Sequence, residues 1–153
     1  MKRFSVLVAL AAFSTGIGWA VHSARADDKP AAPAVGHEKH FDECAKVCAD
    51  CQVACEKNFH HCFKMVEGGK KEHAKAMHLS VDCAEFCAVS AKLTARKSDL
   101  AGPACEACAK ACDVCAAECD KFPDMPEMKA CSDACKKCAA SCREMAKMVG
   151  HKH

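Results

Sequence analysis

The sequence predicts an all-α protein, an antiparallel up-down-up-down four-helix bundle whose core is lined with cysteine. Four stretches without internal Pro or Gly follow one another along the chain, each rich in Ala, Lys and Glu. Cysteines recur within these stretches at intervals of three and four residues, which is the period of one helix face. Short links that contain Gly or Pro separate the stretches, and short links favour antiparallel neighbours.

The four expected helices are separated by recognisable breakers. The pair Gly68-Gly69 ends the first, "SDLAGP" separates the second from the third, and "FPDMP" separates the third from the fourth. Pro103 and Pro126 suit a first helical turn, and Ser98 or Asp99 suits a cap. The helices are therefore expected at 37–66, 71–98, 103–121 and 126–149, which places the bundle at 37–149 and a short His-containing tail at 150–153.

The start of the chain has the pattern of a cleaved signal peptide. Lys2 and Arg3 form a positive start, 4–21 is mostly apolar, and small residues lead up to Ala26. A retained membrane anchor is the alternative, but Ser, Thr and Gly interrupt the apolar stretch and it lacks a strong stop-transfer flank. We therefore expect residues 1–26 to be removed.

Cleavage there leaves a flexible Pro/Ala leader at 27–36 and a protein with no membrane attachment. The expected location is exported, periplasmic or otherwise extracytoplasmic. The "KRF" at the start is a weak match to a twin-arginine signal, so the choice between that route and the general secretory route stays open.

The composition raises a question about the core. The chain has a formal net charge of +2 and no basic stripe, which argues against a nucleic-acid partner. Leu, Ile, Val and Phe supply only 16 of the 127 residues from 27 onward, a fraction typical of disordered chains. The chain also has 16 cysteines, all in this part. Either cysteine replaces the usual core residues, or the chain has no core.

The cysteines fall on one stripe of each expected helix. At about 100° per residue, those between 105 and 119 lie within roughly 80°, and those of the first and last helices within roughly 60°. The second helix has only two, and its stripe continues through Ala76, Ser80, Ser90 and Thr94. The inward-facing thiols are expected to be Cys44, Cys48, Cys51, Cys55, Cys62, Cys83, Cys87, Cys105, Cys108, Cys112, Cys115, Cys119, Cys131, Cys135, Cys138 and Cys142.

Two structural interpretations must be weighed first. Free cysteine packs as a small hydrophobe, so the stripes can be a plain core, although thiols oxidise in exported proteins. A disulfide-stapled structural or interaction protein is the other. Neighbours at i,i+4 have Cβ atoms about 5–6 Å apart, whereas a disulfide needs about 3.5–4.5 Å. Bridges between helices are not excluded by this argument.

Metal binding is the remaining interpretation, since thiolates select Cu(I), zinc or iron–sulfur clusters. The helices lack zinc knuckles, and 105–119 lacks the ferredoxin spacing, although an iron–sulfur electron-transfer protein stays an alternative. One Cu(I) per thiolate leaves the core neutral, whereas four Zn(II) ions leave it charged. Cu(I) accepts two ligands, as offered by Cys44/Cys48, Cys51/Cys55, Cys83/Cys87, Cys108/Cys112, Cys115/Cys119, Cys131/Cys135 and Cys138/Cys142.

These Cys-x-x-x-Cys pairs on four helices behind an export signal resemble the four-helix-bundle copper storage proteins, from about residue 40 onward. The resemblance implies storage of many Cu(I) ions along the bundle axis and a homotetramer. The charge balance predicts a capacity of roughly one Cu(I) per cysteine, and the stored copper would serve supply or detoxification. The resemblance also implies that the paired cysteines, with Cys62 and Cys105, are Cu(I) ligands, and that Asn58 helps to coordinate or orient a site. A copper-delivery partner is implied but not identified. The chain has no catalytic constellation, so we do not expect an enzyme.

Copper needs an entrance to such a core, and Met and His gather at both expected bundle ends. Thioether and imidazole ligands hold Cu(I) more loosely than thiolates, which suits transfer. At one end, Met65 and Met128 fall at the edges of the cysteine stripes, with His60, His61 and His73 nearby. At the other end His37 falls on its stripe, near His40, Met145 and Met148. We include Met65, Met128 and His37 among the expected copper ligands.

Overall fold

The computed structural model describes the backbone of residues 35–150 and the side chains of residues 38–150. Within these residues the chain forms four α-helices and one 3-10 turn, and no strand. The expected signal peptide, most of the leader and the last three residues of the tail lie outside the described part. The elements are α1 (Val35–Glu67), the turn η1 (Lys71–His73), α2 (Ala74–Ala95), α3 (Ala101–Cys119) and α4 (Pro126–Gly150).

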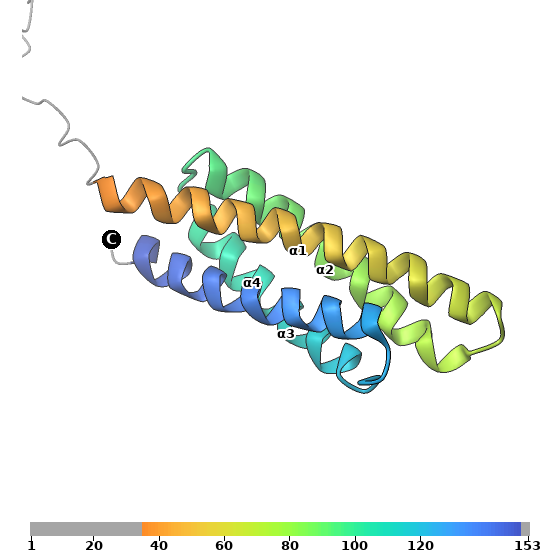
Figure 1. Cartoon of the computed structure of the whole chain (residues 1–153). Coiled ribbons are helices and arrows are strands. Elements are labelled where there is room, and N and C mark those ends of the chain that lie inside the picture. Colours follow the sequence, from red (N-terminus) through yellow and green to blue (C-terminus); the bar gives the residue numbers. More distant parts are fainter. Residues whose placement is uncertain (1–34, 151–153) are drawn as a thin grey trace, which may run out of the picture. The chain divides into compact units, whose positions relative to one another are not determined.

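The four helices pack as an antiparallel bundle, each against its two neighbours in the ring (Figure 1). The pairs α1–α2 and α3–α4 are the most extensively packed, and α2–α3 and α1–α4 close the ring. The start of α1 and the end of α4 lie at one end of the bundle (Figure 1). The predicted all-α four-helix bundle is confirmed.

Glycine ends α1 where the sequence placed a breaker. Gly69 has a φ of 89°, in the left-handed region that favours glycine. The amide of Lys70 donates to the carbonyl of Met65 at 2.9 Å, and that of Gly69 donates to Val66 at 2.9 Å. This pair of bonds is a Schellman motif, which satisfies carbonyls that the helix itself leaves unpaired.

The second expected helix, 71–98, is shorter in the structure. It opens with η1, and α2 ends at Ala95 because Lys97 adopts a φ of 53°. There the amide of Lys97 donates to Thr94 and that of Ser98 to Leu93, which closes the helix in the same way as at Gly69. The expected boundary at 98 is therefore wrong by one turn.

The other helix starts differ by two residues or fewer from expectation. α1 starts at Val35 and includes the last two residues of the expected leader. α3 begins at Ala101 rather than Pro103, because the carbonyl of Ser98 accepts the amide of Ala101 at 2.9 Å and opens the first turn early. α4 begins at Pro126, as predicted, and runs one residue further than expected, to Gly150.

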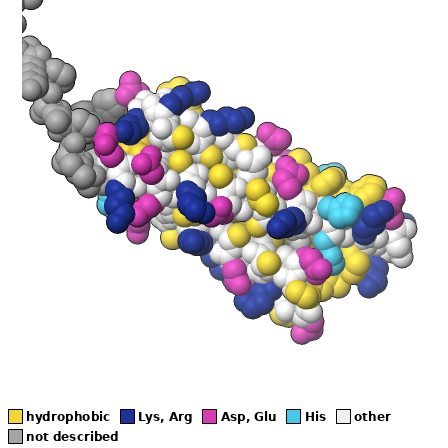
Figure 2. Space-filling view, turned by 45° about the horizontal axis from the view of Figure 1, so that its top comes forward, with side chains coloured by type: hydrophobic (Ala, Val, Ile, Leu, Met, Phe, Trp, Pro, Cys, Tyr) yellow, Lys and Arg dark blue, Asp and Glu magenta, His cyan; other side chains and the backbone are white. Residues whose placement is uncertain are grey.

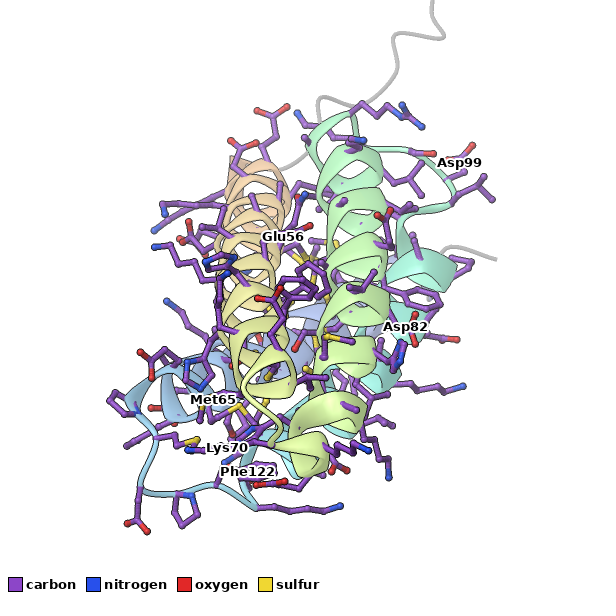
Figure 3. The ribbon with its side chains drawn as sticks, turned by 90° about the vertical axis from the view of Figure 1, so that its right-hand side faces the viewer. Glu56, Met65, Lys70, Asp82, Asp99 and Phe122 are labelled. Atoms are coloured by element: carbon purple, nitrogen blue, oxygen red, sulfur yellow. The ribbon has the colours of Figure 1, made fainter. Side chains whose placement is uncertain are left out.

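The bundle interior consists of sulfur and small side chains. All sixteen cysteines are at most 2% exposed, and seven alanines, Met128 and Met145 are the other buried hydrophobic residues of the described part. Sulfur atoms lie between the helices in Figure 3. On the outside, basic and acidic side chains are interspersed, and histidines gather toward the end where α1 meets α2 (Figure 2). None of the described helices has the length and apolar character of a membrane span.

Candidate metal centre

The helical repeat brings all sixteen predicted thiols to the bundle axis. In each helix the cysteines lie three or four residues apart, except for one interval of seven in α1, so that one narrow stripe faces the other three helices. α1 contributes five thiols, α2 two, α3 five and α4 four. Ala76, Ser80, Ser90 and Thr94 fill the rest of the α2 stripe and are buried, as predicted. The sulfur column is therefore dense in the middle and poorer on the α2 side at both ends.

The sulfur atoms touch mainly between helices. Cys48 and Cys142 have their Sγ atoms 3.4 Å apart. The Sγ atoms of Cys83 and Cys112 are 3.6 Å apart, as are those of Cys87 and Cys108. These distances far exceed a disulfide bond of about 2.05 Å, and all sixteen cysteines are free in the structure. The thiols form a packed column without covalent links.

The pairs one helical turn apart are not the closest ones. Of the seven predicted pairs, Cys108/Cys112 and Cys138/Cys142 have sulfur atoms 4.0 Å apart. The sulfur atoms nearest to each other come from different helices, because each stripe points at the axis where the four helices meet. Most thiols therefore have partners both along and across the bundle, so pairs from different helices are available as ligands beside the predicted pairs within one helix.

Groups of four thiols lie close enough to share a metal ion. Within each group all sulfur atoms are within 4.8 Å of one another. A metal–thiolate bond of about 2.3 Å places two ligands of one ion at most about 4.6 Å apart, so the column can take up metal with small movements. Three of these groups are Cys48/Cys108/Cys138/Cys142, Cys51/Cys83/Cys87/Cys112 and Cys55/Cys115/Cys131/Cys135.

Asn58 replaces a cysteine in the α1 stripe and is 1% exposed. Its amide nitrogen donates to Ser80 Oγ at 3.0 Å and to Cys119 Sγ at 3.5 Å. Its Oδ1 is buried and has no hydrogen-bond partner among the described residues. An unsatisfied buried acceptor costs about 1–3 kcal/mol of folding free energy. This oxygen is therefore available to accept a hydrogen bond or to coordinate a metal ion.

Met128 extends the sulfur column at the end where α1 meets α2. Its side chain is fully buried, and Cys62 Sγ lies 3.6 Å from the Met128 thioether sulfur. Met65 is half-buried at the same end, where Figure 3 also places Phe122. The structure thus brings Met128 to the thiols directly and leaves Met65 at the rim.

A histidine pair lies beside this end. His73 is 1% exposed and stacks on Phe122 with the ring centroids 4.3 Å apart. His61 meets the edge of His73, and its Nδ1 is 3.7 Å from a carboxylate oxygen of Glu127. Burial lowers the pKa of His73, which keeps its imidazole neutral. His60 and His78 are exposed.

The opposite end contains a hollow of about 300 Å³. Cys44, Met145 and Met148 line it, together with His40. Met145 is 2% exposed, although the sequence analysis does not include it among the expected copper ligands. The overlooked signal is its position three residues after Cys142, which continues the α4 stripe. His37, the predicted ligand here, belongs to α1, but its side chain lies outside the described residues.

Burial and mutual hydrogen bonding control the protonation of the thiols. Burial raises the pKa of Cys62 to about 11. In the centre, hydrogen bonds from Cys112 and Cys135 lower the pKa of Cys51. The pKa of Cys87 is raised, chiefly through its hydrogen bond with Cys108. Neighbouring thiols in this cluster therefore shift one another's pKa values in opposite directions.

Both the sequence and the fold resemble those of copper storage proteins. The sequence profile of the copper storage protein family matches residues 37–147. The Cu(I)-bound copper storage protein BsCsp3 is 32% identical, with 70% of this chain and 98% of that one covered and a TM-score of 0.62. Apo copper storage protein 3 from Bacillus subtilis is 34% identical, with coverages of 67% and 95% and a TM-score of 0.58.

Two further relatives extend the comparison. A cytosolic copper storage protein from Streptomyces lividans, solved during copper loading, shares the fold at 23% identity, with coverages of 74% and 98% and a TM-score of 0.68. The uncharacterised cysteine-rich protein YhjQ of Bacillus subtilis (strain 168) is 35% identical over 74 residues, or 47% of this chain. That match spans 65% of YhjQ, slightly less than two thirds of its length.

Proposed function

The chain belongs to the copper storage protein family, a family that stores copper rather than catalysing a reaction, and on that premise we propose that it stores Cu(I) outside the cytoplasm at roughly one ion per cysteine. The observation that carries the proposal is the column of sixteen free, buried thiols whose sulfur atoms are in contact. Storage of this kind serves copper supply or limits copper toxicity.

Charge balance sets the proposed capacity. Each buried thiolate is a negative charge away from water, which is expensive unless a cation neutralises it. One Cu(I) per thiolate releases one proton and leaves the column neutral. Four divalent ions with four thiolates each leave about eight negative charges inside the bundle, where desolvation outweighs their attraction to the metal. A monovalent soft ion therefore suits this interior better than zinc.

The geometry supports the same assignment. Thiolates bind soft ions such as Cu(I), and Cu(I) is stable with two sulfur ligands. Because most thiols have neighbours both along and across the bundle, each can bridge two ions, and the ions can follow one another along the axis. The proposed ligands are the sixteen cysteines. Adjacent ions then share the closely spaced groups such as Cys48/Cys108/Cys138/Cys142.

Further ligands belong to the two ends of the column. We assign Met128 to a terminal site with Cys62, because its thioether sulfur already lies 3.6 Å from that thiol. The unpaired Oδ1 of Asn58 supports its role at a site beside Cys119, either as a ligand or as the group that orients one. Met65 is assigned to the rim of the same end. His37 is assigned to the opposite end, on its position in the α1 stripe alone.

Export and assembly complete the proposal. The signal-like pattern of residues 1–26 supports a location outside the cytoplasm, where the protein takes copper from a delivery partner. A homotetramer, implied by the family resemblance, is supported by large apolar side chains on the outer faces of the helices. Val53, Phe86 and Val89 are between 45% and 53% exposed. Buried contacts between copies would cover such side chains.

An anaerobic Cu(I) titration against a competing chelator, with a thiol count on the same sample, tests this function. The proposal expects about sixteen reactive thiols after denaturation without reductant and a similar number of tightly bound copper ions. Almost no free thiol would instead identify a disulfide-stapled structural protein. A brown protein with acid-labile sulfide would identify an iron–sulfur protein. Cell fractionation tests the location separately.

A further inference from the structure

Three buried sulfur atoms form a closed triangle where α1 meets α4. The Sγ atom of Cys48 lies 3.4 Å from that of Cys142 and 3.8 Å from that of Cys138. The Sγ atoms of Cys138 and Cys142 are 4.0 Å apart and close the triangle. All three side chains are fully buried. The fold therefore gathers three thiols around one point that is shielded from solvent.

A second triangle, which shares no thiol with the first, lies where α2 meets α3. Cys87 Sγ is 3.6 Å from Cys108 Sγ and 3.8 Å from Cys112 Sγ. The Sγ atoms of Cys108 and Cys112 are 4.0 Å apart, and these three side chains are also fully buried. The chain thus offers two separate sets of three thiols.

The spacing within each triangle suits an ion with three sulfur ligands. At a metal–thiolate bond length of about 2.3 Å, two ligands on opposite sides of an ion lie about 4.6 Å apart, and three ligands in one plane around it lie about 4.0 Å apart. Three ligands of a pyramidal ion lie closer still. The edges of the two triangles run from 3.4 to 4.0 Å. They therefore match three ligands in a flat or pyramidal arrangement without spreading the helices.

The buried surroundings add a requirement on charge. Three thiolates carry three negative charges, and a charge inside the bundle is costly unless it is neutralised. At one triangle a monovalent ion leaves two negative charges and a divalent ion leaves one, whereas a trivalent ion leaves none. The ion must also be soft, because soft ions select sulfur. Arsenic(III) meets all three conditions, since it is soft, trivalent and pyramidal.

We propose that the Cys48/Cys138/Cys142 and Cys87/Cys108/Cys112 triangles each bind one arsenic(III), so that the protein sequesters arsenite in addition to copper. The inference goes beyond the proposed copper function. Both loads use the same thiols, so arsenic and copper exclude each other from the triangles.

The binding reaction balances in atoms, charge and electrons. Arsenous acid, As(OH)3, is uncharged at neutral pH and reacts with three thiols. Three As–O bonds and three S–H bonds break, three As–S bonds form, and each thiol proton leaves with a hydroxide as water. Arsenic stays trivalent and no thiol is oxidised. Because reactants and products are all neutral, no charge is left in the buried column at the end of the reaction.

Native mass spectrometry of the reduced, metal-free protein tests the proposal. The protein is incubated anaerobically with a small excess of sodium arsenite, and unbound arsenite is removed. We expect two arsenic atoms per chain, each accompanied by the loss of three hydrogen atoms. X-ray absorption at the arsenic edge should show three sulfur neighbours and no oxygen. A protein that retains no arsenic, or arsenic that keeps an oxygen neighbour, overturns the proposal.

Single variants locate the sites. C48A opens the first triangle and C87A opens the second, so each variant should retain one arsenic atom. C62A is the matched control, because Cys62 is equally buried but its sulfur contacts the thioether of Met128. This variant should retain two. Equal arsenic contents in all three variants overturn the assignment to the triangles.

Two further measurements keep the outcomes distinct. If C48A or C87A does not give the helical circular dichroism of the wild type, C142A or C112A replaces it, since each opens the same triangle. Wild type saturated with Cu(I) should take up no arsenic, and uptake without loss of copper overturns the shared thiols. A wild type that fills with copper but binds no arsenic counts against the arsenic sites alone and leaves the storage function intact.

Discussion

At the scale of the residue, cysteine serves two purposes in this chain, and its protonation state decides which. A protonated thiol packs as a small apolar group, so the bundle has a core before any metal arrives. A deprotonated thiol is a metal ligand with a charge that must be neutralised. Leucine would fill the same stripe but bind nothing, and serine would introduce a hydroxyl with no fixed partner.

Cys135 provides a test at this scale because its sulfur lies within 3.8 Å of three others, those of Cys51, Cys55 and Cys83. C135A should lower the copper capacity by about one ion while the protein stays folded, since one thiolate charge is removed and the remaining charges still need one ion each. The measurement is the endpoint of the anaerobic titration.

Ser132 provides the matched control for this variant. It is equally buried on α4, but its hydroxyl donates to Asp120 rather than to a thiol. S132A should therefore reduce the free energy of unfolding through the lost hydrogen bond and leave the copper capacity unchanged. Equal capacity losses in both variants would contradict the assignment of Cys135 as a ligand.

At the scale of the element, the sequence was sufficient for the helices but not for their contacts. Pro126 and Gly69 could be interpreted directly, because their backbone requirements are local. The sequence does not predict the early start of α3, because no side chain caps the helix at Leu100. The sulfur pairs between helices, such as Cys48 with Cys142, depend on how the helices are rotated and staggered, which no local pattern specifies. Met145, in contrast, could have been predicted from the sequence, because it continues the α4 stripe three residues after Cys142.

The end of α1 gives a prediction at this scale. A Cβ at Gly69 meets no atom within 4 Å, so the effect of G69A comes from its φ of 89° alone. We expect a loss of about 1–2 kcal/mol in the free energy of unfolding, because L-residues other than Gly are strained there. Denaturant unfolding of the reduced, metal-free protein measures it.

The neighbouring glycine is the control. Gly68 lies before the left-handed residue, and a Cβ there would be 3.4 Å from the carbonyl oxygens of Lys64 and Met65, an ordinary contact. G68A should therefore change the stability far less than G69A. Equal destabilisation of the two variants would contradict the assignment of the loss to the left-handed backbone of Gly69.

At the scale of the whole molecule, the bundle is a closed set of helices, and in the function we propose its interior changes from protonated thiols to neutral copper thiolates. The folded protein therefore does not need metal to form, and its stability should depend on pH through the thiols. Family membership and fold agree with the sequence interpretation, while location, assembly and capacity are still proposals. Location and assembly depend on the cell and on other copies of the chain, which a single sequence specifies only indirectly.

The pH dependence of the metal-free protein follows from the buried thiols. The pKa of Cys62 is raised from 9.0 to about 11 in the folded state, so the unfolded chain releases this proton first as the pH rises. Its stabilising contribution is complete below pH 9 and is lost between pH 9 and about 11. Thermal unfolding of the reduced protein should show a falling Tm across this range.

A variant separates this thiol from the rest of the molecule. C62A should show a shallower fall in Tm across the same interval, because one titrating thiol is gone. A metal-free wild type whose Tm stays level from pH 9 to about 11 would be inconsistent with a raised pKa for Cys62.

The balance of one monovalent ion against one buried thiolate is most directly tested by native mass spectrometry of the copper-saturated protein. The mass should rise by roughly sixteen copper atoms and fall by the same number of protons, one for each of the 16 cysteines. A series that stops near four metal ions, or one in which protons and copper are not exchanged one for one, would contradict the account.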